Sequence, residues 1–159
     1  MCGIIGYNGP RKAERILIGG LKKLEYRGYD SAGIALVEQD GIAIYKKQGK
    51  VTALEKILPC DTAATVGIGH TRWATHGAPK DCNAHPHRSG KVTLVHNGII
   101  ENEQALRSML KKQGFSPISD TDTELIAMLM DHCYRGEPRD AIRAACSFGR
   151  LLCPWHFIR

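Results

Sequence analysis

The order of strand-like and helix-like segments is the feature that most restricts how this chain can fold. Short apolar or alternating segments, typical of strands, occupy residues 2–7, 32–37, 42–45, 66–70 and 92–96. Apolar residues with helical spacing occupy residues 10–24, 101–113, 121–133 and 138–145. The two kinds come in blocks and not in regular alternation, which predicts an α+β fold and argues against a doubly wound parallel sheet.

Turn and cap residues mark the ends of several of these segments. Asp40-Gly41 predicts a hairpin turn between two strands. Gly114 is placed to end the preceding helix in the left-handed conformation. Thr121 and Glu124 have the spacing of a capping box, in which the threonine hydroxyl caps the helix and the glutamate returns to the threonine amide.

The composition excludes several classes of protein. Of the 159 residues, 43% are hydrophobic and 24% are charged, as in ordinary globular domains. The net charge of +6 is scattered along the chain and does not form the basic stripe with aromatics that indicates a nucleic-acid binder. No stretch approaches the roughly 20 apolar residues of a membrane helix, and the first residues do not resemble a secretory signal. We therefore expect a cytoplasmic protein that binds neither nucleic acid nor membranes.

Cys2 stands where removal of the initiator methionine would expose its α-amino group. The thiolate is the reactive form of cysteine. An α-amino group, with an ordinary pKa of about 7.7–8.0, can take the thiol proton near neutral pH. One residue then supplies both nucleophile and base, as N-terminal threonine nucleophiles do. The position alone also suits a small residue inside the buried strand that we expect at residues 2–7.

Two further segments contain groups that can bind or polarise a substrate. Arg72 lies where a strand is expected to run into a loop that ends at Gly77, and an arginine can hold a carboxylate with two hydrogen bonds. Asn97 precedes Gly98, and a carboxamide N–H beside a glycine N–H can form an oxyanion hole. Taken singly, each motif has a plainer interpretation: a surface arginine for the first and a hairpin turn for the second.

Six segments of the sequence together resemble one protein family. They are residues 2–7 (Cys-Gly-Ile-Ile-Gly-Tyr), 26–33 (Tyr-Arg-Gly-Tyr-Asp-Ser-Ala-Gly), the loop with Arg72, 83–87 (Asn-Ala-His-Pro-His), the Asn97-Gly98 segment and 121–124 (Thr-Asp-Thr-Glu). Their order and spacing are similar to those of glutamine–fructose-6-phosphate aminotransferases (isomerising), also called glucosamine-6-phosphate synthases. Amidophosphoribosyltransferases, asparagine synthetases and glutamate synthases share the nucleophile but look different around Arg27 and Arg72.

The resemblance implies a fold and a reaction. The implied fold is the N-terminal-nucleophile hydrolase type, a four-layer α/β/β/α sandwich, here incomplete at its C-terminal side. The implied activity is glutamine hydrolysis, with the ammonia passed to fructose 6-phosphate in a part of the enzyme that these residues do not include. The expected partners are L-glutamine and, in full-length members of the family that we expect to be homo-oligomers, fructose 6-phosphate.

By the same resemblance, five positions have roles in glutamine hydrolysis. Cys2 would attack the side-chain amide of glutamine and form a glutamyl thioester. Asn97 and Gly98 would hold the oxyanion. Arg72 would bind the α-carboxylate of glutamine and Asp122 its α-ammonium group, so that opposite charges fix the register of the zwitterion.

Four more positions are implied around this site. Trp73, Thr75 and His76 lie on the segment that resembles a loop closing over glutamine, and Arg27 resembles a support for the surroundings of the nucleophile. The resemblance implies no cofactor and no metal. The histidines that could suggest a metal site do not have the spacing of a helical zinc motif; they are His70, His76, His85, His87 and His96.

The resemblance stops near Ala145, and we expect the chain to divide there. Residues 2–145 would form part of a class II glutaminase domain, whereas residues 146–159 have no counterpart in the family. A one-base shift in codons permitted for residues 149–159 restores a family-like sequence, so we expect the tail to be a frameshift product. Three other interpretations stay open: a gene fragment without function, the glutaminase domain of another class II amidotransferase, and a module that holds glutamine without turnover.

Overall fold

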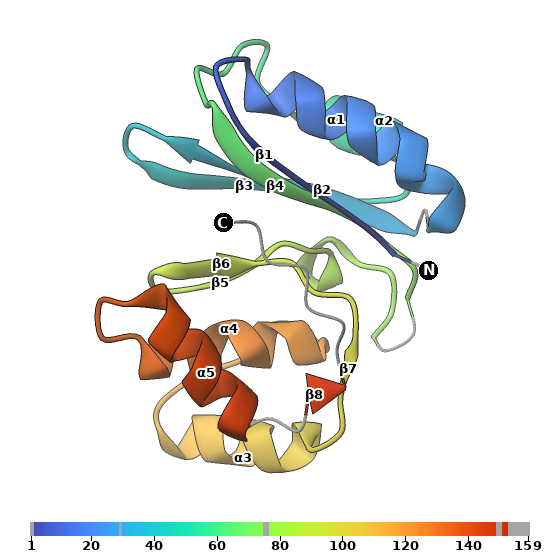
Figure 1. Ribbon diagram of the computed structural model, residues 1–159. Coiled ribbons are helices and arrows are strands. Elements are labelled where there is room, and N and C mark those ends of the chain that lie inside the picture. Colours follow the sequence, from blue (N-terminus) through green and yellow to red (C-terminus); the bar gives the residue numbers. More distant parts are fainter. Residues whose placement is uncertain (1, 29, 75–76, 149–150, 153–159) are drawn as a thin grey trace. The chain divides into compact units, whose positions relative to one another are not determined.

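The protein consists of two compact units. This computed structural model describes residues 2–28, 30–74, 77–148 and 151–152. The first unit ends at Pro86 and the second begins at His87, and each has its own hydrophobic core. Both units contain helices and strands (Figure 1), which confirms the predicted α+β class.

An antiparallel sheet of four strands forms the first unit. In spatial order its strands are β1 (Gly3–Asn8), β4 (Val66–Arg72), β2 (Ser31–Glu38) and β3 (Gly41–Gln48). β2 and β3 form a hairpin, whereas β4 returns to the middle of the sheet and separates β1 from β2 (Figure 1). β1 is therefore an edge strand that pairs with β4.

Two helices cover one face of this sheet. α1 (Ala13–Leu24) packs along β1 and β4, and α2 (Val51–Glu55) packs against β3 and β2 (Figure 1). Helical spacing directs the apolar residues of α1 to one side, and this side is buried against the strands. The resulting core includes Ala13, Leu17, Ile18, Leu21, Ile34, Leu36, Val51 and Leu54.

Two predictions for the start of the chain differ from the structure. β1 is half-buried along most of its length and not fully buried, because an edge strand is covered less than a central one. α1 begins at Ala13 and not at Pro10, and Gly19 and Gly20 do not interrupt it. Tertiary packing of its apolar face outweighs the low helix propensity of the two glycines.

The hairpin between β2 and β3 is where the sequence predicts it, with a shift of one residue. Its two turn residues are Gln39 and Asp40. Gly41, expected in the turn, is the first residue of β3 and has a φ of +131°. The Asp-Gly signal located the turn because glycine adopts this backbone conformation at little steric cost.

Three helices and short strands form the second unit. Its elements are β5 (His87–Ser89), β6 (Val92–Leu94), β7 (Ile99–Ile100), α3 (Glu103–Lys112), α4 (Asp122–Cys133), α5 (Pro138–Phe148) and β8 (Leu151–Leu152). The β5–β6 hairpin, α3 and α5 all pack against α4, which is buried along most of its length. Within the described residues, no helix is both long enough and apolar enough to cross a membrane.

The start of α4 differs from the predicted capping box. Thr121 is the N-cap residue, but its side chain makes no capping hydrogen bond. Its hydroxyl instead lies 2.8 Å from Ser119 Oγ and 3.0 Å from His87 Nε2. The Glu124 carboxylate accepts hydrogen bonds from the N–H groups of Ile118 and Ser119. Both motif residues therefore bond to groups outside the helix, which a local capping pattern does not include.

The other predicted elements of this unit agree with the structure, with small changes. β6 ends at Leu94, two residues earlier than predicted. α3 buries Leu106 and Leu110 as expected, whereas Ala105 is exposed. Gly114 follows α3 with a φ of +87°, as predicted for a glycine that ends a helix.

The last helix extends past the predicted division of the chain. α5 begins at Pro138, as expected from the preference of proline for the first helical position, and it continues through Phe148. The predicted boundary at Ala145 therefore falls inside a helix. The division into residues 2–145 and 146–159 stays a prediction.

Gly19 and Gly33 allow a matched pair of alanine substitutions in the first unit. A Cβ at Gly19, on the exposed side of α1, would meet no atom within 4 Å, so Gly19→Ala should raise the free energy of unfolding by about 1 kcal/mol. A Cβ at Gly33 would overlap the carbonyl oxygens of Tyr45 and His85, so Gly33→Ala should lower it by about 1–3 kcal/mol. Thermal unfolding measures both changes, and equal midpoints for the two variants would contradict the packing of β2.

Candidate active site

Pairing between β1 and β4 positions Cys2. Gly3 pairs with Thr71, and the Gly3 N–H donates to the Thr71 hydroxyl at 3.2 Å, so Cys2 lies at the C-terminal end of β4. There the Trp73 N–H donates a hydrogen bond to Cys2 Sγ at 3.2 Å, and Cys2 Sγ lies 3.7 Å from the Trp73 carbonyl oxygen. A backbone N–H directed at an acceptor stabilises negative charge on it, and a nucleophilic thiolate carries such a charge.

Asp30 orients the peptide that donates this hydrogen bond. Its carboxylate accepts hydrogen bonds from the Ala74 N–H and the Ser31 hydroxyl, and its own N–H donates to the Arg72 carbonyl oxygen at 3.2 Å. These contacts hold the residues on both sides of Trp73. The sequence prediction gave Asp30 no separate role, although an acidic residue just before a predicted strand, here two positions before residue 32, is a signal that could have suggested one.

Arg72 is the last residue of β4, and the interpretation as a surface arginine is wrong. The residue is 4% exposed. Its guanidinium donates to the Gly77 carbonyl oxygen at 3.0 Å and lies 3.5 Å from the Ala78 carbonyl oxygen. The buried Asn83 amide donates to the same Ala78 oxygen at 2.9 Å; Asn83 belongs to one of the six sequence segments, but the sequence prediction gave it no role of its own. Arg72 therefore stands at the base of the loop that follows β4, and its planar set of five donors suits a carboxylate.

The predicted glutamine loop is described in part. Trp73 leaves half of its surface exposed, while its backbone bonds to Cys2. Thr75 and His76, predicted on the same loop, lie outside the described residues. The described ends of the loop are held by Asp30 on one side and by Arg72 and Asn83 on the other.

Arg27 ends a single 3-10 turn, η1 (Glu25–Arg27), and is half-buried. The next residue, Gly28, packs against the end of β4. A Cβ at Gly28 would lie 3.0 Å from the Trp73 nitrogen and 3.1 Å from the Arg72 carbonyl oxygen. Arg27 thus belongs to a segment that contacts the backbone of two predicted site residues, and its supporting role stays a prediction.

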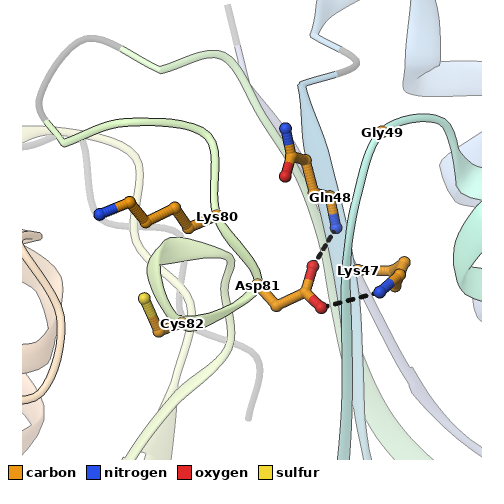
Figure 2. A pocket seen from close by; sticks show the side chains of 6 residues that line it. All are labelled: Lys47, Gln48, Gly49, Lys80, Asp81 and Cys82. Carbon is orange, nitrogen blue, oxygen red and sulfur yellow. Dashed lines mark hydrogen bonds and ion pairs between the residues drawn. The ribbon is translucent and has the colours of Figure 1, made fainter.

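A hollow adjoins the short turn η2 (Asp81–Asn83). Figure 2 shows the residues that line it: Lys47, Gln48, Gly49, Lys80, Asp81 and Cys82. The Asp81 carboxylate accepts hydrogen bonds from Lys47 Nζ at 2.9 Å and from the Gln48 N–H at 2.7 Å. The Lys47 hydrogen bond first, and then that of Gln48, lower the pKa of Asp81. These contacts hold the segment that follows the loop against β3. We therefore interpret the residues around this hollow as structural, and not as the reaction site.

In the second unit, Asp122 is linked to the segment that carries Asn97 and Gly98. The two residues lie between β6 and β7 and do not form a hairpin turn, because β7 pairs with β8. Asp122 is the half-buried first residue of α4, where the helix dipole favours negative charge. Its Oδ2 accepts a hydrogen bond from the Ile100 N–H at 3.0 Å. The predicted oxyanion segment and the predicted ammonium-binding carboxylate are therefore brought together within one unit.

His96, directly before Asn97, is buried beside the start of α4. Its Nδ1 lies 3.3 Å from Thr123 Oγ1. Burial lowers the pKa of His96, and the nearby Asp122 carboxylate opposes this effect to a smaller extent. The neutral imidazole is therefore favoured in the folded chain, where it joins the segment before Asn97 to α4.

Other histidines also pack against partners inside the two units. The rings of His70 and His85 are stacked with their centroids 4.2 Å apart, and His87 Nε2 lies 3.0 Å from Thr121 Oγ1. Among residues 2–28, 30–74, 77–148 and 151–152, no three His, Cys, Asp or Glu side chains are grouped so that they could hold a metal ion.

Comparison with known proteins finds a matching family domain and curated relatives. The family described as "Glutamine amidotransferase domain" matches residues 70–145. Glutamine–fructose-6-phosphate aminotransferase (isomerizing) of Clostridium acetobutylicum is 51% identical, over 92% of this chain and 25% of that protein. The protein of the same name from Pyrococcus horikoshii is 55% identical, over 90% of this chain and 25% of that protein. The chain contains a glutamine amidotransferase domain.

The comparisons also confirm the predicted branch of that family. Relatives from Clostridium, Pyrococcus and Streptomyces coelicolor all have the name that the six sequence segments predicted. This amidotransferase chain spans about a quarter of the length of these relatives. The match to the family covers the end of β4, the loop with Arg72, the Asn97-Gly98 segment and the first turn of α4.

Solved structures share the fold. Glutamine phosphoribosylpyrophosphate amidotransferase from B. subtilis has a TM-score of 0.79 and 28% identity, over 93% of this chain and 33% of that chain. A structure described as the allosteric regulatory enzyme of purine biosynthesis has a TM-score of 0.79 and 29% identity, over 92% and 33%. These likenesses confirm the predicted N-terminal-nucleophile hydrolase fold of the amidotransferase domain. The four-layer stacking stays a prediction.

Lowering the pH should destabilise the amidotransferase domain through His96. Because its folded-state pKa is lowered, the unfolded chain binds the proton first as the pH falls through the ordinary value of about 6.5, and stability is lost below that pH. His96→Gln removes this group. Between about pH 7.5 and about pH 5.5, the variant should therefore lose less free energy of unfolding than the parent chain. Urea unfolding at both pH values measures the two losses, and equal losses would contradict a buried neutral His96.

Proposed function

We propose that the chain hydrolyses L-glutamine through a thioester on Cys2 and supplies the ammonia for amino-sugar synthesis. The observation that carries the proposal is the hydrogen bond from the Trp73 N–H to Cys2 Sγ, at the end of the strand that holds the buried Arg72. A thiol nucleophile and a carboxylate-binding group thus belong to one strand end, as hydrolysis of an amino-acid side-chain amide requires. The match to the glutamine amidotransferase domain supports glutamine as the substrate.

The proposed reaction starts from the Cys2 α-amino group, exposed by removal of Met1, which takes the thiol proton. Cys2 Sγ attacks the amide carbon of glutamine, a C–S bond forms, and the carbonyl oxygen becomes an oxyanion held by the N–H groups of Asn97 and Gly98. The oxyanion then collapses, the C–N bond breaks, and the nitrogen leaves as ammonia with the proton stored on the α-ammonium group. Water adds to the thioester, which releases glutamate and restores the thiol.

Recognition of glutamine uses its two opposite charges. Arg72 binds the α-carboxylate and Asp122 binds the α-ammonium group. A substrate that lacks either charge therefore loses one of these two contacts and should bind more weakly. Charge-assisted hydrogen bonds of this kind are about twice as strong as neutral ones. The residues proposed to cover the substrate are Trp73, Thr75 and His76, and the residue proposed to support the nucleophile is Arg27.

The proposed acceptor of the ammonia is fructose 6-phosphate, which would become glucosamine 6-phosphate. The support is the name shared by relatives of which this chain spans about a quarter. The sugar-phosphate step is therefore assigned to sequence outside these 159 residues, and the whole enzyme is proposed to be a homo-oligomer. A cytoplasmic setting suits the reaction, because reducing conditions keep the Cys2 thiol free.

A diazoketone analogue of glutamine should label Cys2 alone. Cys60, Cys82 and Cys146 are exposed, but only Cys2 would react with an electrophile that is held as glutamine is held. Peptide mapping measures the site of labelling, and intact mass should show that Met1 is absent. Cys2→Ala should abolish the labelling. A label spread over the exposed thiols, or retention of Met1 in most molecules, would count against the proposed mechanism.

Arg72→Ala should raise KM for glutamine about tenfold to hundredfold, because a charge-assisted contact worth roughly 1.5–3 kcal/mol is lost. kcat should change less, since the α-carboxylate is bound alike in the ground state and the transition state. Arg15→Ala, which removes an exposed arginine of α1, is the control and should leave both parameters unchanged. An unchanged KM for Arg72→Ala would refute its assignment, and a parent chain that binds glutamine without hydrolysing it would indicate a binding module.

A further inference from the structure

The Glu124 carboxylate holds a loop against the first turn of α4. Glu124 is 6% exposed. Its Oε2 accepts hydrogen bonds from the Ser119 N–H at 2.6 Å and the Ser119 hydroxyl at 2.7 Å, and the Ile118 N–H lies 3.1 Å from both carboxylate oxygens. Both partners belong to a segment without regular secondary structure. Charge-assisted hydrogen bonds are short and directional, so the carboxylate determines where this loop meets the helix.

The same network extends to the residue that precedes Asp122. Ser119 Oγ accepts a hydrogen bond from the Thr121 N–H at 3.3 Å and lies 2.8 Å from Thr121 Oγ1. Thr121 Oγ1 also lies 3.0 Å from His87 Nε2. Ser119, Thr121 and His87 are all buried. Thr121, the residue directly before Asp122, is therefore held through both its backbone and its side chain by a network that includes Glu124.

This arrangement assigns Glu124 more than a capping function. In a capping box, a glutamate at this position would accept a hydrogen bond from the N-cap amide, here that of Thr121. Glu124 instead reaches the two residues before Asp120, and the Thr121 amide is bonded to Ser119 Oγ. The carboxylate thus sets the path of the chain into α4, and with it the direction in which the first helical residue points its side chain.

We propose that Glu124 is a positioning residue for Asp122, which it holds where its carboxylate meets the α-ammonium group of glutamine. The inference rests on the proposed function, in which Asp122 binds that group. The Asp122 side chain is itself fixed by the Ile100 N–H at 3.0 Å, so a shift of the first turn of α4 changes both its position and its link to the segment after Gly98. Loss of Glu124 should therefore weaken recognition of the ammonium group and spare the chemistry at the amide.

The test compares glutamine with 4-carbamoylbutanoate, which is glutamine without its α-amino group. Glu124→Gln keeps the size of the side chain but replaces one acceptor oxygen with a donor group. For this variant, kcat/KM for glutamine should fall about tenfold, mainly through KM, because a small misplacement of a binding group is costly. For 4-carbamoylbutanoate, the same ratio should change less than about twofold, since Asp122 has no charge to bind there.

Two further variants make the comparison specific. Ser119→Ala removes one hydrogen bond to the carboxylate and the link to Thr121, so it should show the same substrate selectivity to a smaller extent. Glu103→Gln is the matched control, because Glu103 lies in the first turn of α3 and pairs with Arg107. This control should leave both substrates unaffected.

The outcomes separate this inference from the proposed function. Equal losses with the two substrates, or no loss with glutamine, would overturn the positioning role while the hydrolysis of glutamine by the parent chain stands. A parent chain that hydrolyses no glutamine would overturn the proposed function and this assignment with it. If Glu124→Gln does not fold, Ser119→Ala decides by the same comparison. Asp122→Asn combined with Ser119→Ala should be no worse than Asp122→Asn alone, and additive losses would overturn the role.

Discussion

The antiparallel pairing of β4 with its two neighbours is the interaction on which the surroundings of Cys2, the proposed nucleophile, depend. On one side the register pairs Gly3 with Thr71, which places Cys2 at the end of β4. On the other side it pairs Ser31 with Arg72, which places Asp30 beside the same strand end. A shift of one residue in either pairing would turn every side chain to the opposite face. One strand end therefore holds the amide that contacts the sulfur, the buried guanidinium of Arg72, and Asp30, whose carboxylate bonds to the Ala74 N–H that follows Trp73.

In the second unit, the segments that carry the proposed site residues are held in place by side-chain hydrogen bonds and not by long strands. Its strands are two or three residues long, too short to fix a loop by ladder hydrogen bonds alone. The segments around Asn97 and before Asp122 are held instead by side chains that bond to backbone N–H groups. Buried carboxylates suit this purpose, since each oxygen can accept more than one hydrogen bond, and a carboxylate at a helix N-terminus is also stabilised by the helix dipole.

The sequence predicted the elements better than the contacts that position the site. Periodicity located the helices and most strands, because burial of one face leaves a local pattern. It could not show that Arg72 is buried, since that depends on Asn83 and on the path of the loop between them. The bond from Ala74 to the Asp30 carboxylate joins residues 44 positions apart, and no local signal encodes such a pair. At α4 the local signal was misleading: Thr121 and Glu124 have the spacing of a capping box, but both side chains bond to partners outside the helix instead.

Gly28 shows that the lack of a Cβ can matter at a candidate active site. Its φ of −179° is open to any residue, so backbone freedom does not explain why a glycine stands there. The explanation is space, because a Cβ would lie 3.0 Å from the Trp73 nitrogen, the atom whose hydrogen is directed at Cys2 Sγ. The packing around the proposed nucleophile therefore restricts a position that has no side chain. An evolutionary comparison that scores residues by their functional groups alone would overlook this position.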